Sequence, residues 1–213
     1  PSVAASRSVL LYQHASPRLS QLTWFDARGQ AIGRVGDSNA DRDPALSPDG
    51  RAVAVARPDE RSARSNLWLI DLARGSNQRL TFGDGEDRYP VWSPDGARLV
   101  FASRRNGEHV LMTISADGGG KEDKRAMSPQ PLQPTHWSVD GRVVLYTTAG
   151  SKTGLDVWAL PMTGDGRASP ILQSTFNESD AQLSPDGRWL AYVSNESGRD
   201  DIYVQPFPQQ TGK

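Results

Sequence analysis

The 213-residue sequence contains no cysteine, which excludes disulfides, thiolate metal sites and a cysteine nucleophile. Long apolar runs are also missing. The longest are the five residues 52–56 and 189–193, whereas a membrane-spanning helix needs about 20. Neither sign of charge dominates, since 24 Lys and Arg stand against 25 Asp and Glu. The composition therefore predicts neither membrane insertion by this segment nor a nucleic-acid partner.

What the sequence does have is an internal repeat. Tetrads of the Ser-Pro-Asp-Gly type begin at Ser47, Ser93, Ser138 and Ser184, spaced by 46, 45 and 46 residues. A β-rich run follows each tetrad, and a second begins 17 to 19 residues after the tetrad serine. Pro-Asp-Gly favours a tight turn because Pro fixes φ and Gly accepts positive φ. Each repeat therefore predicts a hairpin.

A repeat of about 45 residues with three or four short strands is typical of a propeller blade, and no helical period of 3.6 residues is present. We predict an all-β fold, a β-propeller of four-stranded blades. Outer fourth strands are expected near residues 78–82, 124–127 and 170–173. The blades are expected at residues 1–42 (partial), 43–86, 87–131, 132–177 and 178–213 (partial).

The two end repeats differ from the middle ones. The first is expected to lack its inner strand and the last its outer strand, which leaves three complete blades and two partial ones. This pattern predicts a single, partial propeller, or a strained ring of five in which strands from both ends share a blade. An open run leaves an apolar sheet face uncovered at each end, so homo-association through the terminal blades is also predicted.

Three sequence features carry a family resemblance. They are the Leu/Trp-Ser-Pro-Asp-Gly-Arg motif, the Arg79-Leu80-Thr81 segment, and the run from Ser197 to Pro208. These resemble the WD40-like repeats of the TolB type (PD40). More narrowly, they are similar to the C-terminal propeller of soil-bacterial Ser/Thr protein kinases. The resemblance implies a bacterial propeller and favours an extracytoplasmic location, but a propeller fold does not specify an activity.

Catalytic motifs are missing from this stretch. The sequence shows no kinase Gly-rich loop, His-Arg-Asp or Asp-Phe-Gly motif, and no Gly-x-Ser-x-Gly elbow. Its three histidines show no metal-ligand spacing. Of these, His136 precedes Trp137 on an expected inner strand and is the one predicted near the channel. The tetrad aspartates are expected to serve the turns.

The opposite mouth of the channel is predicted to be acidic, because Asp, Glu and Asn cluster in the connections between blades. Hard cations such as Ca²⁺ take six to eight oxygen ligands. A calcium site at this mouth would use Asp43, Asp87, Glu178 and Asp180.

Two functions follow from this mouth. The first is a non-catalytic recognition or scaffold module that binds a peptide, protein or small ligand through Asp43, Arg88, His136, Glu178 and Asp180. The alternative is a Ca²⁺-dependent ester or lactone hydrolase, similar to propeller lactonases, in which the cation polarises a carbonyl oxygen. In that alternative His136 is the one candidate catalytic side chain. EDTA-sensitive turnover of a chromogenic ester would distinguish them.

Overall fold

The computed structural model describes residues 3–5, 10–15, 19–59, 62, 64–150, 153–164 and 166–207. These residues form antiparallel strands in five sheets, each following the chain order. The first sheet contains β1 (Val3–Ala5), β2 (Leu10–Ala15), β3 (Ser20–Phe25) and β4 (Ala31–Asn39). The second contains β5 (Arg42–Leu46), β6 (Ala52–Pro58), β7 (Ser65–Asp71) and β8 (Asn77–Arg79). The third contains β9 (Glu86–Trp92), β10 (Arg98–Arg105), β11 (Glu108–Ser115) and β12 (Asp123–Ser128). The fourth contains β13 (Leu132–Trp137), β14 (Val143–Ala149), β15 (Leu155–Pro161) and β16 (Ser169–Leu172). The fifth contains β17 (Glu178–Leu183), β18 (Trp189–Ser194) and β19 (Asp201–Pro206).

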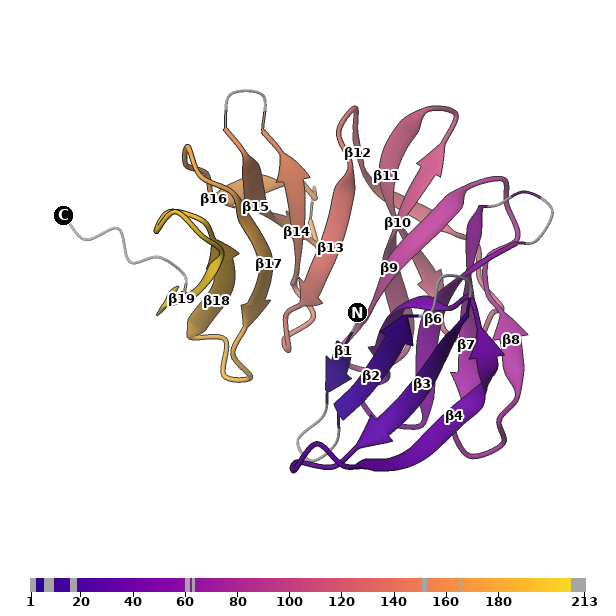
Figure 1. Cartoon of the computed structure of the whole chain (residues 1–213). Coiled ribbons are helices and arrows are strands. Elements are labelled where there is room, and N and C mark those ends of the chain that lie inside the picture. Colours follow the sequence, from indigo (N-terminus) through magenta and orange to yellow (C-terminus); the bar gives the residue numbers. More distant parts are fainter. Residues whose placement is uncertain are drawn as a thin grey trace.

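The sheets follow one another around an arc as the blades of a propeller (Figure 1). Contacts between β1 and β5, β5 and β9, β9 and β13, and β13 and β17 join the first strands of successive sheets. These five are therefore the inner strands. The described part of the chain contains no helix long and apolar enough to cross a membrane. The predicted all-β propeller fold is confirmed.

The four tetrads form the turns between the first and second strands of sheets two to five. At the first turn the Ser47 hydroxyl donates to Asp49 Oδ1 over 2.6 Å and accepts the Ala52 amide over 2.9 Å. Gly50 has a φ of 70°, which an L side chain rarely adopts. The serine-aspartate bond recurs in the other tetrads at 2.5, 2.6 and 2.5 Å. The tetrad aspartates are therefore turn residues, as the sequence predicted.

Apolar clusters between successive sheets form the core. On β6, Val53 and Val55 pack toward the first sheet, whereas Ala54 and Ala56 pack toward the third. All four are fully buried. Both faces of such a strand are apolar because each sheet lies between two others. Burial of each valine contributes on the order of 2 kcal/mol.

The two end sheets differ from the expectation in one respect. The first sheet is complete, because β1 pairs with β2 in the inner position that the sequence predicted to be empty. The segment lacks a tetrad after it, and the tetrad was the signal used to locate inner strands. The fifth sheet has three strands among the described residues, none of them from the N-terminal segment. Within the described residues, the shared blade of the five-membered ring is therefore not formed.

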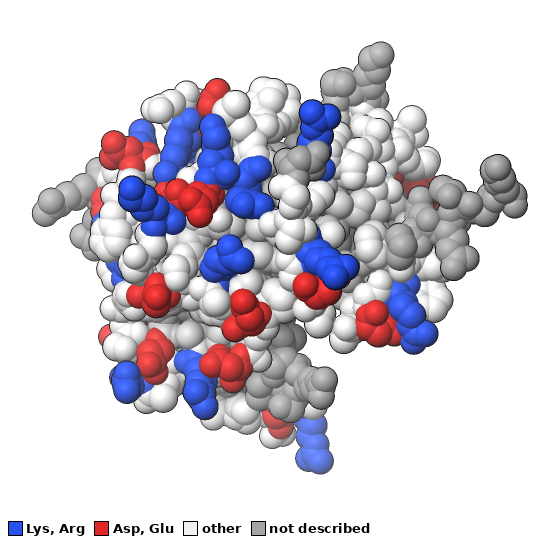
Figure 2. Space-filling model, turned by 180° about the vertical axis from the view of Figure 1, so that it is seen from behind, with Lys and Arg blue, Asp and Glu red and all other residues white. Residues whose placement is uncertain are grey.

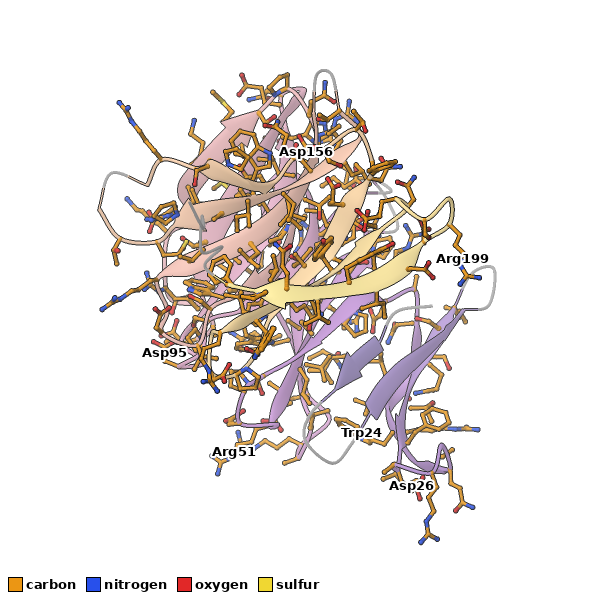
Figure 3. The ribbon with its side chains drawn as sticks, turned by 90° about the vertical axis from the view of Figure 1, so that its left-hand side faces the viewer. Trp24, Asp26, Arg51, Asp95, Asp156 and Arg199 are labelled. Carbon is orange, nitrogen blue, oxygen red and sulfur yellow. The ribbon has the colours of Figure 1, made fainter. Side chains whose placement is uncertain are left out.

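The fifth sheet exposes an apolar face away from the fourth sheet. Trp189, Ile202 and Val204 on this face are 47%, 77% and 63% exposed. Figure 3 views the molecule from this side, with β19 nearest the viewer. One repeat earlier, Leu145 and Val157 of the fourth sheet occupy the equivalent face and are buried against the fifth sheet. The fifth sheet thus exposes an apolar face whose equivalent in the fourth sheet is buried against the next sheet.

Candidate functional site

The residues expected at the channel mouth lie at the end of the propeller opposite the tetrads. Neighbouring strands are antiparallel, so the connections into each inner strand share one end with the turns between second and third strands. Asp43, Arg88, Glu178 and Asp180 all lie near the starts of inner strands at this end. We call this end the mouth.

A β-bulge recurs on the inner strands four residues before the tetrad serine. Asp43, Tyr89 and Asp180 have φ values of 51°, 55° and 53° there. The strand pairing shifts register at this point in β5, β9 and β17, and also in β13, where Pro134 stands. Such bulges re-aim side chains and are common beside functional sites. The bulges were not predicted from the sequence, because the residues at this position are Asp, Tyr, Pro and Asp and share no common side chain.

Asp43 and Arg88 meet across the second and third sheets. Arg88 donates from Nε to Asp43 Oδ2 over 2.9 Å and from Nη2 to Oδ1 over 3.1 Å. The Asp43 side chain is 12% exposed and that of Arg88 27%. Burial alone would lower the pKa of Arg88, but the hydrogen bond and the charge of Asp43 outweigh it and raise that pKa. The guanidinium also lies 4.6 Å from the Tyr89 ring. Asp43 is thus held by a forked ion pair.

Asp41 and Asp87, the repeat-equivalent acids at the starts of these blades, have other partners. Asp41 accepts from Arg57 Nε over 2.6 Å and from Arg57 Nη2 over 3.0 Å. Asp87 is fully buried and accepts from the Ser103 hydroxyl over 2.6 Å. Arg105 Nη2 lies 3.6 Å from Asp87 Oδ1. These acids tie each inner strand to the strand beside it.

Glu178 and Asp180 lie on β17, in the fifth sheet. Glu178 is buried and accepts a short hydrogen bond from Ser174. Asp180 is exposed, and its carboxylate accepts from its neighbour Ser179 over 3.1 Å. Among the described residues, no hydrogen bond or ion pair joins either acid to the Asp43-Arg88 pair. Four of the five residues expected to act together are therefore divided between two parts of the mouth.

His136 lies apart from both groups. It is paired with Leu145 across β13 and β14, and Leu145 packs in the cluster between the fourth and fifth sheets. Residues opposite each other in a ladder share a face, so His136 faces this interface. Its Nε2 is buried without a hydrogen-bond partner, and burial lowers its pKa. The side chain thus lies between two sheets, where burial disfavours its protonated form.

The four expected calcium ligands do not gather. Within the described ranges, no three His, Asp or Glu side chains form a group that could hold a metal ion. Asp43 is paired with Arg88, Asp87 with Ser103, Glu178 with Ser174, and Asp180 with Ser179. Each carboxylate has a separate partner, so this donor set does not fit the six to eight oxygens that Ca²⁺ requires.

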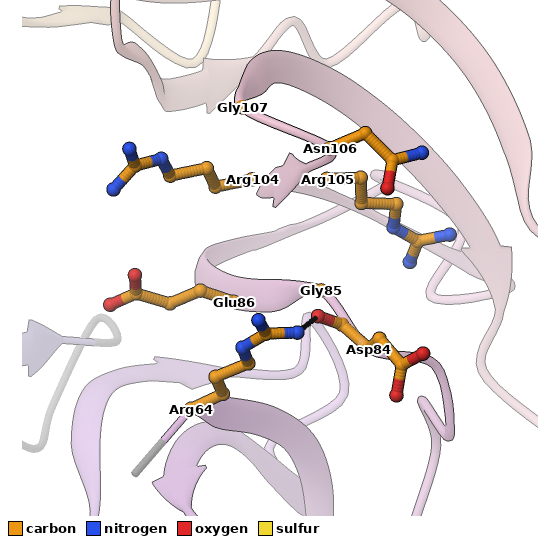
Figure 4. Close-up of a pocket in the computed structure, with 8 residues that line it drawn as sticks. All are labelled: Arg64, Asp84, Gly85, Glu86, Arg104, Arg105, Asn106 and Gly107. Carbon is orange, nitrogen blue, oxygen red and sulfur yellow. Dashed lines mark hydrogen bonds between the residues drawn. The ribbon is translucent and has the colours of Figure 1, made fainter. Parts of the chain in front are cut away.

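A cleft opens at the mouth between the second and third sheets (Figure 4), and it was not predicted from the sequence. Its volume is about 540 Å³. Its lining comes from the turn before β7, the connection into β9 and the hairpin between β10 and β11: Arg64, Asp84, Gly85, Glu86, Arg104, Arg105, Asn106 and Gly107. Arg64 thus joins Arg104 and Arg105 from a segment that is distant in the sequence, and Figure 4 shows the side chains of Arg104 and Arg105 extending in opposite directions.

Surface charge outside this cleft is mixed. Figure 2 shows Lys and Arg side chains interleaved with Asp and Glu on the face seen from behind. Several Lys and Arg side chains gather in the upper left of this view around Asp and Glu, and elsewhere the two signs are interleaved, so the described side chains do not form one continuous basic stripe. A nucleic-acid backbone would favour such a stripe.

Known proteins share this repeat. The family model described as TolB beta propeller domain (PD40) matches residues 1–206. The Bacillus subtilis protein named uncharacterized peptidase YuxL is 27% identical over 197 residues, which cover 75% of this chain and 30% of that protein. The Agrobacterium fabrum protein Atu1656 is 29% identical over 158 residues, covering 69% of this chain and 52% of the relative. The chain thus spans about half of one curated relative and less than a third of the other.

Solved structures of TolB proteins have a similar fold. The crystal structure of TolB from Acinetobacter baumannii matches with a TM-score of 0.75 at 20% identity, over 95% of this chain and 50% of that one. A TolB candidate from Agrobacterium tumefaciens matches with a TM-score of 0.77 at 19% identity, over 94% and 73%. The narrower likeness to kinase-linked propellers stays a prediction. The chain belongs to the TolB beta propeller domain family.

Proposed function

We propose that the chain is a non-catalytic recognition module that binds a peptide or protein segment at the mouth. The observation that carries this proposal is the recurring bulge on the inner strands. It brings Asp43, Tyr89 and Asp180 to one level of three blades in a backbone region that L residues seldom occupy. Backbone strain of this kind clusters at binding and active sites. A small ligand at the same mouth remains within this proposal.

The hydrolase alternative has less support. Its cation needs a shared set of oxygens, and the four carboxylates have separate partners. Its candidate catalytic side chain, His136, lies in the interface between two sheets, and Leu145 is its cross-strand neighbour. A general base must lie within reach of the proton it abstracts. The peptidase relative YuxL shares 30% of its length with this chain, so its name does not assign peptidase chemistry to this propeller.

The test is a peptide-display selection on the immobilised chain. Selected peptides are expected to bind Asp180→Asn about fivefold more weakly or worse, because a charge-assisted hydrogen bond is lost. Asparagine tolerates the left-handed backbone of Asp180, so the fold is kept. The matched control is Asp140→Asn, which also removes an exposed carboxylate, but at the tetrad end. Peptides that bind both variants equally, or EDTA-sensitive ester turnover by the chain, would contradict the proposal.

We also propose that a second copy of this chain covers the outer face of the fifth sheet. The equivalent face of the fourth sheet is already an interface, and Trp189, Ile202 and Val204 present uncharged apolar surface. Two identical uncharged faces can pair about a twofold axis without opposing like charges. Light scattering is expected to show a dimer that Ile202→Lys with Val204→Lys converts to monomer. A monomeric unmodified chain would overturn this.

A further inference from the structure

We propose that the arginine cleft at the mouth, between the second and third sheets, binds a carboxylate of a peptide ligand through Arg64 and Arg104. This rests on the proposed recognition function and names a ligand group and a site for it. The cleft lies beside the inner-strand residues already described. Asp84 and Glu86 of the acidic connections line it, but none of the five residues expected to bind the ligand does. Its size, about 540 Å³, suits a short peptide segment.

Arg105 lines the cleft, but its guanidinium is already bound to other residues of the protein. It forms ion pairs with Asp87 and Glu122, and its Nε donates to the Ser103 hydroxyl over 2.9 Å. Two carboxylates therefore balance its charge. Gly85 lies directly over this group, since a Cβ there would approach Ser103 Oγ to 2.7 Å and Arg105 Nε to 2.9 Å. Ion pairs, a hydrogen bond and close packing thus hold this part of the cleft lining in place.

The positive charge of Arg64 is not balanced by a carboxylate among the described residues. Its Nη1 donates a short hydrogen bond to the main-chain carbonyl of Asp84, which orients the guanidinium without neutralising it. Figure 4 shows the Asp84 carboxylate turned away from this guanidinium. No ion pair of Arg64 with another described residue is formed within 4 Å. A guanidinium oriented in this way, with donors to spare, matches the geometry of a carboxylate.

Arg104 supplies the second free cation. It is exposed, and within the described part of the chain its side chain has no hydrogen bond or ion pair. It lies opposite Glu86 in the ladder of β9 and β10, and both side chains extend in the same direction (Figure 4). The Glu86 carboxylate limits the negative charge that the cleft accepts, because it would repel a second ligand carboxylate beside the first. The cleft therefore suits a single carboxylate flanked by neutral or basic residues.

The experiment titrates the isotope-labelled full chain with Ac-Ala-Glu-Ala-NH₂ and follows arginine side-chain NMR signals. Saturable binding is expected, with the glutamine version of the peptide at least tenfold weaker. N-acetyl-trialanine with a free C-terminus shows whether a terminal carboxylate is accepted as well as a side chain. Triglutamate is expected to bind more weakly than the single-glutamate peptide because of Glu86. Inorganic phosphate that binds where both carboxylate probes fail would overturn the assignment of ligand class.

Variants locate the site. Arg64→Gln and Arg104→Gln are each expected to weaken the peptide about tenfold without changing the unfolding midpoint, whereas Arg51→Gln, at the tetrad end, leaves binding unchanged. Equal affinity in all three variants would overturn the inference. Failure here is distinguishable from failure of the proposed function. If display-selected peptides depend on Asp180 but the carboxylate probe does not bind, the inference alone is wrong. If the probe binds the cleft while display-selected peptides bind Asp180→Asn and Asp140→Asn equally, the binding role of the inner-strand bulges is wrong and the cleft assignment stands.

Discussion

Asp43 and Asp180 form a matched pair for measuring what the forked ion pair contributes to stability. Both lie at the same repeat position with nearly the same backbone, at φ values of 51° and 53°. Asp43 bonds Arg88 of the next blade, whereas Asp180 bonds its neighbour Ser179. Asp43→Asn and Asp180→Asn remove one charge each, and asparagine accepts the left-handed backbone as aspartate does. The difference between the two variants therefore isolates the ion pair.

The expected magnitude follows from the burial of this pair. Fully exposed ion pairs contribute about 0.2–1 kcal/mol, and breaking fully buried ones costs about 3–5 kcal/mol. The pair lies between these limits, with side chains 12% and 27% exposed. Asp43→Asn should therefore lower the free energy of unfolding by about 2 kcal/mol, since it leaves the Arg88 charge half-buried without its partner. Asp180→Asn should change it by less than about 0.5 kcal/mol.

Urea denaturation followed by tryptophan fluorescence measures both values. The slope against urea should be the same in the two variants, because neither changes the surface exposed on unfolding. In an Arg88→Gln background the effect of Asp43→Asn should shrink, which a double-mutant cycle detects. Equal losses in the two aspartate variants, or an unchanged effect in the Arg88→Gln background, would refute the reasoning.

Three further predictions concern the turns, a buried phenol and the cleft floor. The Ser184 hydroxyl is the largest of the causes that lower the pKa of Asp186 to about 2. Ser184→Ala should raise that pKa toward 3.8 in a carboxyl NMR titration. Because the folded-state pKa lies below the unfolded one, the contribution of Asp186 to stability is present above about pH 4 and lost as pH falls toward 2; an unmoved pKa would contradict this. Burial raises the pKa of Tyr146 to about 12, so stability should fall as pH rises from about 10 toward 12, and Tyr146→Phe should remove the last step of the absorbance titration. Gly85→Ala should cost about 2 kcal/mol because its Cβ would meet buried Ser103 and Asp87, whereas Gly33→Ala, with its nearest atom at 3.7 Å, should cost clearly less; equal losses would show that the close approach is relieved elsewhere.

The repeat made most of the fold predictable. Strand pairs around a Pro-Asp-Gly turn are local features, and a period of 45 or 46 residues places equivalent strands in successive sheets. The same period accounts for the ion pair, because Asp43 and Arg88 are 45 residues apart and so lie in neighbouring blades. β1 was missed because Val3–Ala5 is short and is followed by no tetrad. Its place is set by pairing with β2, which the local sequence does not reveal.

The site was less predictable than the fold. The acidic residues of the connections between blades can be read from the sequence, but their partners depend on side-chain reach across sheets. Glu178 accepts a hydrogen bond from Ser174, and His136 lies on the same face of the fourth sheet as Leu145. Arg64 and Arg104 were not singled out because each looks like an ordinary loop arginine. They line one cleft only because two turns and a connection from different blades meet at the same end.

The recognition proposal is tested most directly by an amide chemical-shift map of the chain with a display-selected peptide. Binding at the mouth should perturb the starts of β5, β9 and β17, with Asp43, Tyr89 and Asp180 among the most affected residues. The tetrad turns at the opposite end should keep their shifts. Perturbations centred on those turns, or spread evenly over the surface, would contradict a recognition site at the mouth.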